Sequence, residues 1–327
     1  MAGRRTVAIG VVASVFAIVA TIGTAVPGAV ARSAQPEAHF VWHGVGGNYI
    51  PLVGDFDGDH HSDVFWYAPG KAGDSIWYGR TDRHFTVINL QVLGNYRPVV
   101  FDFNGDGRSD ILWYGPGAQA DWVWLGNANH TFTVRRFSMG GKYLPAAGDF
   151  NGDGHDDILW YAPGTAHDFM WLGKGNGQFT SHSLTINGDY RLAVGDYNGD
   201  HRDDVFFTSV VPNEPNYLDL AAANGTLVGH AIKAAITHSL TFAVDANHDR
   251  RDDVFVYQPG HGADWVWYSG TSGLPATKRI TSIDGIYRPV SGDFDGDGYD
   301  DIFWYGPGPL PDHVWFDVAH DTLPAPP

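Results

Sequence analysis

The segment Gly148-Asp-Phe-Asn-Gly-Asp-Gly-His-Asp-Asp-Ile158 decides how this chain folds, because related copies of it occur six times. The first aspartates of the six copies are Asp55, Asp102, Asp149, Asp196, Asp245 and Asp293, so the interval between successive copies is nearly constant. Self-similarity at a nearly constant period is typical of repeat proteins, in which each unit is one supersecondary structure.

Each unit contains four short β-rich segments separated by turn residues. In the third unit, Tyr143-Leu-Pro145 precedes the aspartate segment, and the apolar run 158–161 follows it. A Pro-Gly turn, an Asp-x-apolar-Trp element and a Phe/Thr/Val stretch complete the unit. Four strands in about 40–50 residues, repeated in tandem, are the composition of a β-propeller blade. We therefore predict an all-β fold, a six-bladed β-propeller of four-stranded blades over residues 39–320.

The two ends of the repeat region are out of phase with each other. The segment His39-Phe-Val-Trp-His-Gly-Val45 resembles the Phe-rich last strand of a unit, whereas the sixth unit ends soon after Trp315 without such a strand. We predict that the N-terminal strand completes the last blade and closes the ring, which would remove the free sheet edges.

Residues 1–31 have the pattern of a signal peptide. Arg4 and Arg5 form a basic start, an apolar run covers residues 7–22, and Ala29-Val-Ala31 is a small-x-small cleavage pattern. We expect cleavage after Ala31, with Ala34 as the alternative, and a secreted, extracellular protein. An uncleaved membrane anchor is the other interpretation, although the run of about 16 residues is short against the ~20 needed to span a bilayer.

Two flanking segments complete the predicted domain organisation. Residues 32–38 are expected to form a linker and residues 321–327 a disordered tail.

The export route stays open, because the paired arginines Arg4 and Arg5 fit both the general secretory route and the twin-arginine route. No other stretch is apolar enough to span a membrane.

Composition excludes several classes of site. The net charge is −17, which argues against nucleic acid as a partner because such binding needs a basic surface. The chain has no cysteine, so disulfides, thiolate metal sites and Cys nucleophiles are excluded. Apolar residues make up 43% of the chain, enough for a large core. We expect a monomer.

The aspartate segments have the spacing Asp-x-Asx-x-Asp-x-x-x-Asp, which predicts calcium loops. Calcium takes six to eight oxygen ligands, and side chains at loop positions 1, 3, 5 and 9, with the backbone carbonyl of position 7, supply them. The predicted ligands are Asp55, Asp57, Asp59, His61 and Asp63; Asp102, Asn104, Asp106, Arg108 and Asp110; Asp149, Asn151, Asp153, His155 and Asp157; Asp196, Asn198, Asp200, Arg202 and Asp204; Asp245, Asn247, Asp249, Arg251 and Asp253; and Asp293, Asp295, Asp297, Tyr299 and Asp301. The alternatives are magnesium, which prefers fewer protein ligands, or simple Asp-Gly turns without a metal.

The six loops differ in quality. The second, third and sixth loops have glycine at positions 4 and 6. The first and fourth place His60 and His201 at position 6, where a positive φ would cost a non-glycine residue about 1 kcal/mol. The fifth has His248 and Arg250 at both positions, so among up to six calcium ions the fifth should bind weakest. Six divalent ions would offset most of the net charge of −17 and should stabilise the fold.

The loop, the Asp-Asp-Ile/Val sequence that follows it and the repeat length resemble the FG-GAP/VCBS repeat family over residues 39–318. Similar repeats form the integrin α-subunit propeller, bacterial surface proteins, fungal lectins and ancillary parts of polysaccharide-degrading enzymes. The resemblance implies that calcium is mainly structural. The fourth unit departs from the pattern because it lacks the Trp-Tyr-x-Pro-Gly and Asp-x-x-Trp elements, and the fifth lacks its Tyr-x-Pro.

Three functions fit the sequence. A binding module for glycans or an extracellular protein surface is the first, because aromatic rings stack on sugars and arginines hydrogen-bond to hydroxyls. The candidate ligand-binding residues are Tyr96, Arg97, Tyr190, Arg191, Tyr287 and Arg288. The alternative is that they are packing residues whose arginines face solvent. A non-catalytic structural or adhesive protein is the second. A polysaccharide-active enzyme is the third, but the chain has no Gly-x-Ser-x-Gly or His-Glu-x-x-His motif, and Glu214 is its sole candidate acid.

Overall fold

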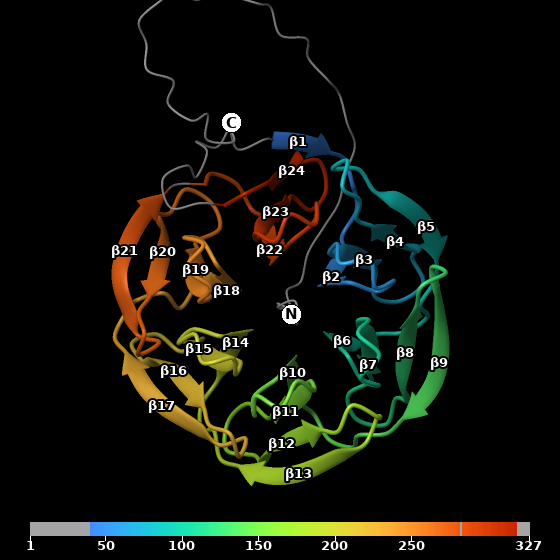
Figure 1. Cartoon of the computed structure of the whole chain (residues 1–327). Coiled ribbons are helices and arrows are strands. Elements are labelled where there is room, and N and C mark those ends of the chain that lie inside the picture. The colour runs from blue at the N-terminus through green and yellow to red at the C-terminus, as the bar shows by residue number, and fades with distance from the viewer. Residues whose placement is uncertain (1–39, 282, 319–327) are drawn as a thin grey trace, which may run out of the picture.

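The computed structural model describes residues 40–281 and 283–318, and it confirms the predicted all-β, six-bladed propeller. Six separate four-stranded antiparallel sheets surround a central axis (Figure 1). The blades are β2–β5 (Ile50–Gly54, Asp63–Tyr67, Asp74–Tyr78, Thr86–Leu90); β6–β9 (Arg97–Phe101, Asp110–Tyr114, Asp121–Asn127, Thr131–Phe137); β10–β13 (Leu144–Gly148, Asp157–Tyr161, Asp168–Gly173, Phe179–Leu184); β14–β17 (Tyr190–Gly195, Asp204–Ser209, Asn216–Ala221, Leu227–Ile232); β18–β21 (Leu240–Val244, Asp253–Tyr257, Asp264–Ser269, Pro275–Thr281); and β22–β24 (Arg288–Gly292, Asp301–Tyr305, Asp312–Trp315) with β1 (Phe40–His43).

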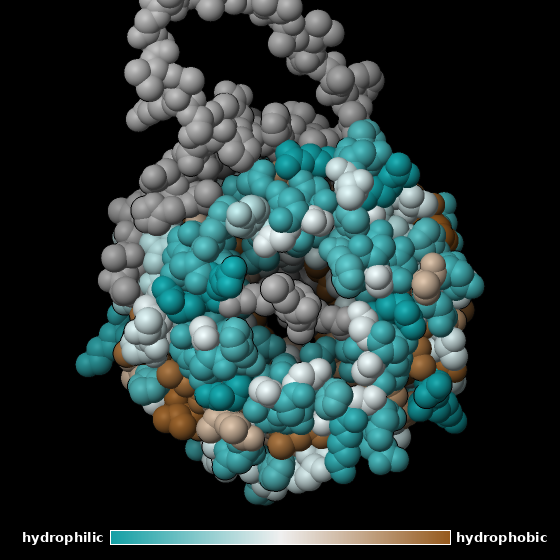
Figure 2. Space-filling view, viewed as in Figure 1, coloured by the Kyte–Doolittle hydropathy of each residue, from teal (hydrophilic) through white to brown (hydrophobic). Residues whose placement is uncertain are grey.

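Within each blade the first strand faces the axis and the last strand lies on the rim (Figure 1). The second strands β3, β7, β11, β15, β19 and β23 are buried at every position. They are apolar without alternation because a neighbouring blade covers each of their faces. Exposed apolar side chains such as Val87, Val134 and Val228 lie on the rim strands β5, β9 and β17, while hydrophilic residues dominate the face seen in Figure 2.

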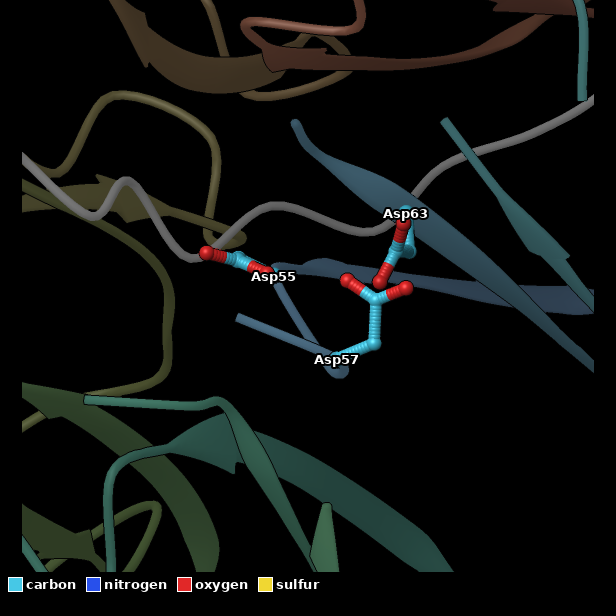
Figure 3. Close-up of side chains that lie close together, drawn as sticks. All are labelled: Asp55, Asp57 and Asp63. Carbon is cyan, nitrogen blue, oxygen red and sulfur yellow. The ribbon is translucent and has the colours of Figure 1, made fainter. Parts of the chain in front are cut away.

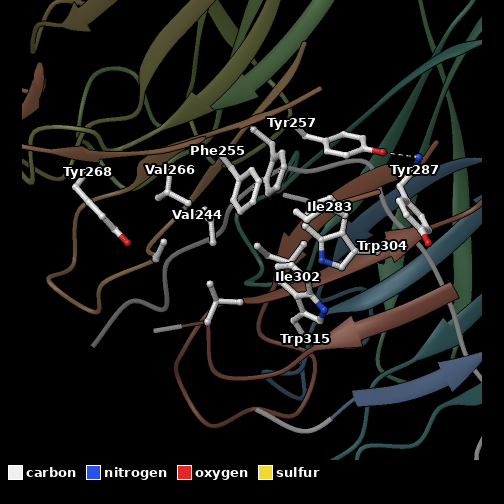
Figure 4. Packing of buried hydrophobic residues seen from close by; sticks show 13 residues of the cluster. Val244, Phe255, Tyr257, Val266, Tyr268, Ile283, Tyr287, Ile302, Trp304 and Trp315 are labelled. Atoms are coloured by element: carbon white, nitrogen blue, oxygen red, sulfur yellow. Dashed lines mark hydrogen bonds between the residues drawn. The ribbon is translucent and has the colours of Figure 1, made fainter. Parts of the chain in front are cut away.

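Aromatic side chains fill the seams between blades, as expected for most of the tryptophans. Trp113 lies edge-on to Tyr67 of the preceding blade with ring centroids 4.9 Å apart. Trp304 meets Tyr257 in the same way at 5.2 Å, within the cluster drawn in Figure 4. Edge-to-face pairs of this kind add about 0.5–1.5 kcal/mol each beyond the area they bury.

The tyrosine that ends the second strand also bridges the seam through its hydroxyl. Tyr67 Oη donates to Gly94 O at 2.7 Å and accepts from Tyr96 N at 2.8 Å. The seam between the sixth and first blades has the same pair of contacts, since Tyr305 Oη donates to Gly47 O and accepts from Tyr49 N. The first and sixth blades are therefore joined by the same contacts as other neighbours.

β1 pairs antiparallel with β24, with Phe40 opposite Trp315, so it is the outer strand of the sixth sheet. That this strand is what holds the ring shut stays a prediction. The predicted signal peptide, linker and tail lie outside the described residues. Among the described residues no helix has the length and hydropathy needed to cross a membrane.

Candidate metal centre

The aspartate loops connect the first and second strands of each blade, all at one end of the strands. In the third loop, Asp149 Oδ1 accepts from Gly152 N and Asp153 N, and Asp149 Oδ2 accepts from Gly154 N at 2.8 Å. The equivalent aspartates of four other loops, Asp55, Asp102, Asp196 and Asp293, make the same three contacts. The position-1 carboxylate thus organises a tight turn around itself.

The non-glycine residues at loop positions 4 and 6 have the positive φ that the sequence suggested. At position 6, φ is 73° for His60, 68° for His201 and 70° for Arg250, and His248 at position 4 of the fifth loop has a φ of 60°. A left-handed conformation costs an L-residue about 1–2 kcal/mol. The fifth loop is therefore the most strained of the six, which agrees with the expectation that it is the weakest site.

Two loops gather carboxylates closely enough for a metal ion. Oxygens of Asp55, Asp57 and Asp63 lie within 4.8 Å of one another. Figure 3 shows the carboxylates of Asp57 and Asp63 turned toward each other. In the sixth loop, Asp293, Asp295 and Asp297 form a second such group. Ligand oxygens about 2.3–2.6 Å from one calcium ion lie within about 5 Å of one another, so these acidic clusters could hold it.

The position-9 aspartates are buried. One carboxylate oxygen of each anchors the loop to the third strand, and in three loops that the structure describes the other oxygen is left without a hydrogen bond of good geometry. Asp157 Oδ1 accepts from Gly173 N at 2.7 Å, which ties the loop to the end of the third strand. The other carboxylate oxygens of Asp157, Asp204 and Asp253 are buried without a hydrogen bond of good geometry among the described residues. Burial raises the pKa of each of these three carboxyls to about 8. A buried carboxylate oxygen without a hydrogen bond of good geometry, in a loop whose other aspartates also raise its pKa, is chemically suited to be a cation ligand.

At position 7 the structure adds a side-chain role that the sequence did not suggest. The guanidinium groups of Arg108, Arg202 and Arg251 form ion pairs with the position-5 aspartates of their own loops, Asp106, Asp200 and Asp249. In the first loop, His61 Nδ1 lies 2.9 Å from Asp59 Oδ1. These pairs reduce the unpaired negative charge at position 5. The carbonyl ligands predicted at position 7 stay a prediction, as does the full ligand set.

Position 8 joins neighbouring loops, and sequence reasoning missed it. Asp203 Oδ2 accepts from Asp149 N at 2.8 Å, and Asp203 N donates to Asp149 O at 2.9 Å. Asp156, Asp252 and Asp300 accept equivalent bonds from Asp102 N, Asp196 N and Asp245 N. At the same position, Ser109 N and Ser62 N donate to the backbone carbonyls of Asp55 and Asp293, so the backbone bond is kept where the aspartate is replaced by serine. The first aspartate of the repeated Asp-Asp pair therefore links one loop to the next around the ring.

A basic side chain from the following blade, arginine or histidine, reaches each of the two all-aspartate loops. Arg83 Nε donates to Asp295 Oδ2 at 2.6 Å, and His130 Nε2 lies 2.8 Å from Asp57 Oδ2. Arg83 and His130 occupy equivalent places in the turns between the third and fourth strands. The corresponding residues of the next three blades are Gly177, Gly225 and Gly273, and the loops they follow have asparagine at position 3. Aspartate at position 3 thus occurs with a basic side chain across the seam, and in three of the four other loops asparagine occurs with glycine.

The predicted ligand-binding pairs lie at the opposite end of the inner strands from the loops. Tyr96 packs edge-on to Trp113 with ring centroids 6.0 Å apart, and Tyr287 is buried. Arg97, Arg191 and Arg288 each donate to a backbone carbonyl of the next blade. The structure places the three pairs in alternate blades and gives them inter-blade contacts. Their ligand binding is untested.

The fourth blade differs from the others at its third strand. Asp219 stands where the other blades have Trp77, Trp124, Trp171, Trp267 and Trp315, as the strand pairings show. Asp219 Oδ1 is buried without a hydrogen bond among the described residues, and burial raises the pKa of this carboxyl to about 6. Glu214, the acid singled out from the sequence, is exposed on a turn.

A family profile of FG-GAP-like repeats matches residues 55–113, 102–160, 149–207 and 245–304. The chain belongs to the FG-GAP-like repeat family. Each matched segment spans two successive aspartate loops, so the loops that build the candidate metal sites also define the repeat. None of the curated proteins matches the chain in sequence.

Two solved structures are similar to this FG-GAP-like propeller. One is a lectin from Agrocybe aegerita described for its specific recognition of non-reducing terminal N-acetylglucosamine, with 18% identity, a TM-score of 0.55 and coverage of 84% of this chain and 81% of the lectin. The other is AofleA from Arthrobotrys oligospora, with 13% identity, a TM-score of 0.53 and coverage of 88% and 89%. At such identities the likeness shows the fold alone.

Proposed function

We propose that this protein is a secreted, calcium-stabilised propeller that binds carbohydrate. The observation that carries the proposal is the similarity of fold, over 84% of the chain, to a lectin that recognises N-acetylglucosamine. Repeated blades present similar surfaces around one ring, which suits a ligand that is itself repetitive.

Calcium has a structural role in this proposal. The carboxylates of loop positions 1, 3, 5 and 9 would hold the ion, and the ion would supply positive charge between groups that otherwise repel one another. Position 1 organises the turn, position 9 ties it to the third strand, and position 8 links it to the next blade. Binding of calcium to the folded state alone would stabilise the whole ring.

A glycan array tests the carbohydrate proposal. The protein lacking the segment 1–31, applied with calcium, is expected to bind a subset of glycans and to release them in free competing sugar. Binding to no glycan on an array of neutral and acidic structures would contradict it.

Incubation with plant and microbial polysaccharides, followed by an assay for reducing ends, is expected to show no cleavage, and release of products would favour the enzyme alternative.

A further inference from the structure

The second blade carries a pocket on the face opposite the aspartate loops. Residues 117–121, from the turn between β7 and β8, and residues 136–140, at the end of β9 and beyond, line a pocket of about 710 Å³. Its size is in the usual range for small-molecule sites. The metal loops lie at the other end of the strands, so this pocket is separate from them.

Arg136 gives the pocket its chemistry. Its guanidinium carbon lies 5.3 Å from the centre of the Trp122 ring, a cation–π contact that holds the group in place. Eight other arginines of the described chain give their guanidinium protons to an acceptor: Arg80, Arg83, Arg97, Arg108, Arg191, Arg202, Arg251 and Arg288. Arg136, like Arg135 and Arg250, has no such acceptor among the described residues; of these three it is the one that lines the pocket, so its forked donors are available to a ligand there.

The other polar groups of the pocket do not compete for Arg136. Asp121 is the one acidic residue in the pocket lining, and its oxygens accept from Gly115 N at 2.8 Å and Met139 N at 2.6 Å. Asp121 is also 3% exposed, whereas Arg136 is exposed. Gln119 and Ser138 add an amide and a hydroxyl to the lining, groups that suit the hydroxyls of a sugar.

The pair of Trp122 and Arg136 is particular to this blade. The two residues face each other across β8 and β9. The equivalent cross-strand pairs are Ser75 and Asn89, Phe169 and Ser183, Tyr217 and Ala231, Trp265 and Ile280, and His313 and Trp42 in the first, third, fourth, fifth and sixth blades. Burial lowers the pKa of His313 to about 4, so this imidazole is uncharged near neutral pH. None of these pairs combines an aromatic platform with a cation. A site here would therefore be single rather than repeated around the ring.

We propose that this pocket binds a sugar ring that bears a carboxylate, as in a uronic acid. Arg136 pairs with the carboxylate through two parallel N–H···O bonds, the geometry in which arginine recognises carboxylates. Gln119 and Ser138 bind ring hydroxyls. This inference rests on the proposed carbohydrate binding and names the substrate class of one site within it.

Calorimetric titration with trimers of galacturonate, glucuronate and mannuronate tests the proposal, with the galacturonate trimer methyl ester as the uncharged control. At least one uronate is expected to bind, and in the galacturonate case the ester should bind about tenfold more weakly. Arg136→Gln should weaken uronate binding about tenfold or more, because a charged bidentate contact is lost. Arg135→Gln removes the same charge from the neighbouring position of β9 and should change the affinity less than twofold.

Three results overturn the proposal: none of the uronates binds, the ester binds as well as the acid, or Arg136→Gln binds like the unchanged protein. A thermal melt of both variants shows whether either is misfolded, and Trp122→Phe, which keeps a ring beneath the guanidinium, should retain part of the affinity. If the glycan array detects neutral sugars while no uronate binds, this inference fails and the proposed function stands. If neither the array nor the titrations detect binding, both the uronate site and the proposed carbohydrate binding are contradicted.

Discussion

In the third and fourth blades the glycine that ends the first strand packs directly against the next blade. A Cβ at Gly148 would lie 2.5 Å from Asp203 Oδ2, the carboxylate that accepts from Asp149 N. Gly195 meets Asp252 Oδ2 in the same way at 2.7 Å. A Cβ at Gly148 or Gly195 would therefore force the neighbouring aspartate to shift. The second and fifth blades form the same link with Phe101 and Val244 at this position, so the requirement for glycine is local to the third and fourth blades.

Gly148→Ala should therefore destabilise the protein by about 1–3 kcal/mol, the usual cost of overpacking a tight site. Urea unfolding measures the change. Gly73→Ala is the matched control, because a Cβ at Gly73 has no atom within 4 Å and its φ is ordinary. Equal stabilities of the two variants would contradict this account of the glycine.

Asp219 predicts a pH dependence of stability. Burial raises the pKa of its carboxyl to about 6, with His230 opposing the shift, whereas an unfolded aspartate has a pKa of about 3.9. Between these values the folded protein holds more protons than the unfolded chain, so the free energy of unfolding falls as the pH rises from about 4 to 6 and stays lower above. Asp219→Asn removes this loss and should stabilise the protein at pH 7 by about 1 kcal/mol.

Unfolding by urea at pH 4.5 and pH 7, with and without the substitution, measures this effect. Asp189→Asn, an exposed site in the same blade, controls for the general loss of one negative charge. If Asp219→Asn stabilises the protein no more than Asp189→Asn does at pH 7, ionisation of the buried Asp219 carboxyl does not lower the free energy of unfolding.

At the scale of the element, the turn between the third and fourth strands is matched to the loop of the preceding blade. Arg83 pairs with Asp295 across the seam, and Asp295 is 7% exposed. With divalent ions removed by a chelator, Arg83→Gly leaves the Asp295 carboxylate without its ion pair. The substitution should lower the free energy of unfolding by about 1–3 kcal/mol. The double variant Arg83→Gly/Asp295→Asn recreates the combination of glycine and asparagine found where the turns of the third, fourth and fifth blades meet the preceding loops, and it should recover part of the loss.

A double-mutant cycle of these variants, measured by urea unfolding, isolates the coupling between turn and loop. We expect a coupling energy of about 1 kcal/mol or more. Strictly additive effects would show that the two elements are not matched and that the association between aspartate and cation in this chain has no energetic basis.

The strand β1 is the second element whose role can be tested. It covers the outer edge of β24, which would otherwise expose unpaired backbone groups. Removing residues 32–43 should lower the melting temperature and promote self-association, whereas removing residues 32–38 should do neither. A full-stability monomer from the longer deletion would show that the ring closes without β1.

At the scale of the whole molecule, the repeat period and the turn chemistry predicted the number of blades, the strands and the position of every loop, because these features are local. The contacts that join the blades could not be predicted in the same way. Arg83 and Asp295 are 212 residues apart in sequence, and no pattern within one unit pairs them. The pocket lined by Arg136 was missed as well, because its signal is a departure of one blade from the repeat.

The central claim is that the aspartate loops bind calcium and thereby hold the ring together. Scanning calorimetry of the protein lacking the segment 1–31, in calcium and in chelator, tests it most directly. If several loops bind, calcium at 100 times its dissociation constant should raise the melting temperature by more than about 10 °C, since each site adds about 2.7 kcal/mol. Magnesium at the same concentration should have a smaller effect. Identical melting temperatures in calcium and in chelator would contradict the claim.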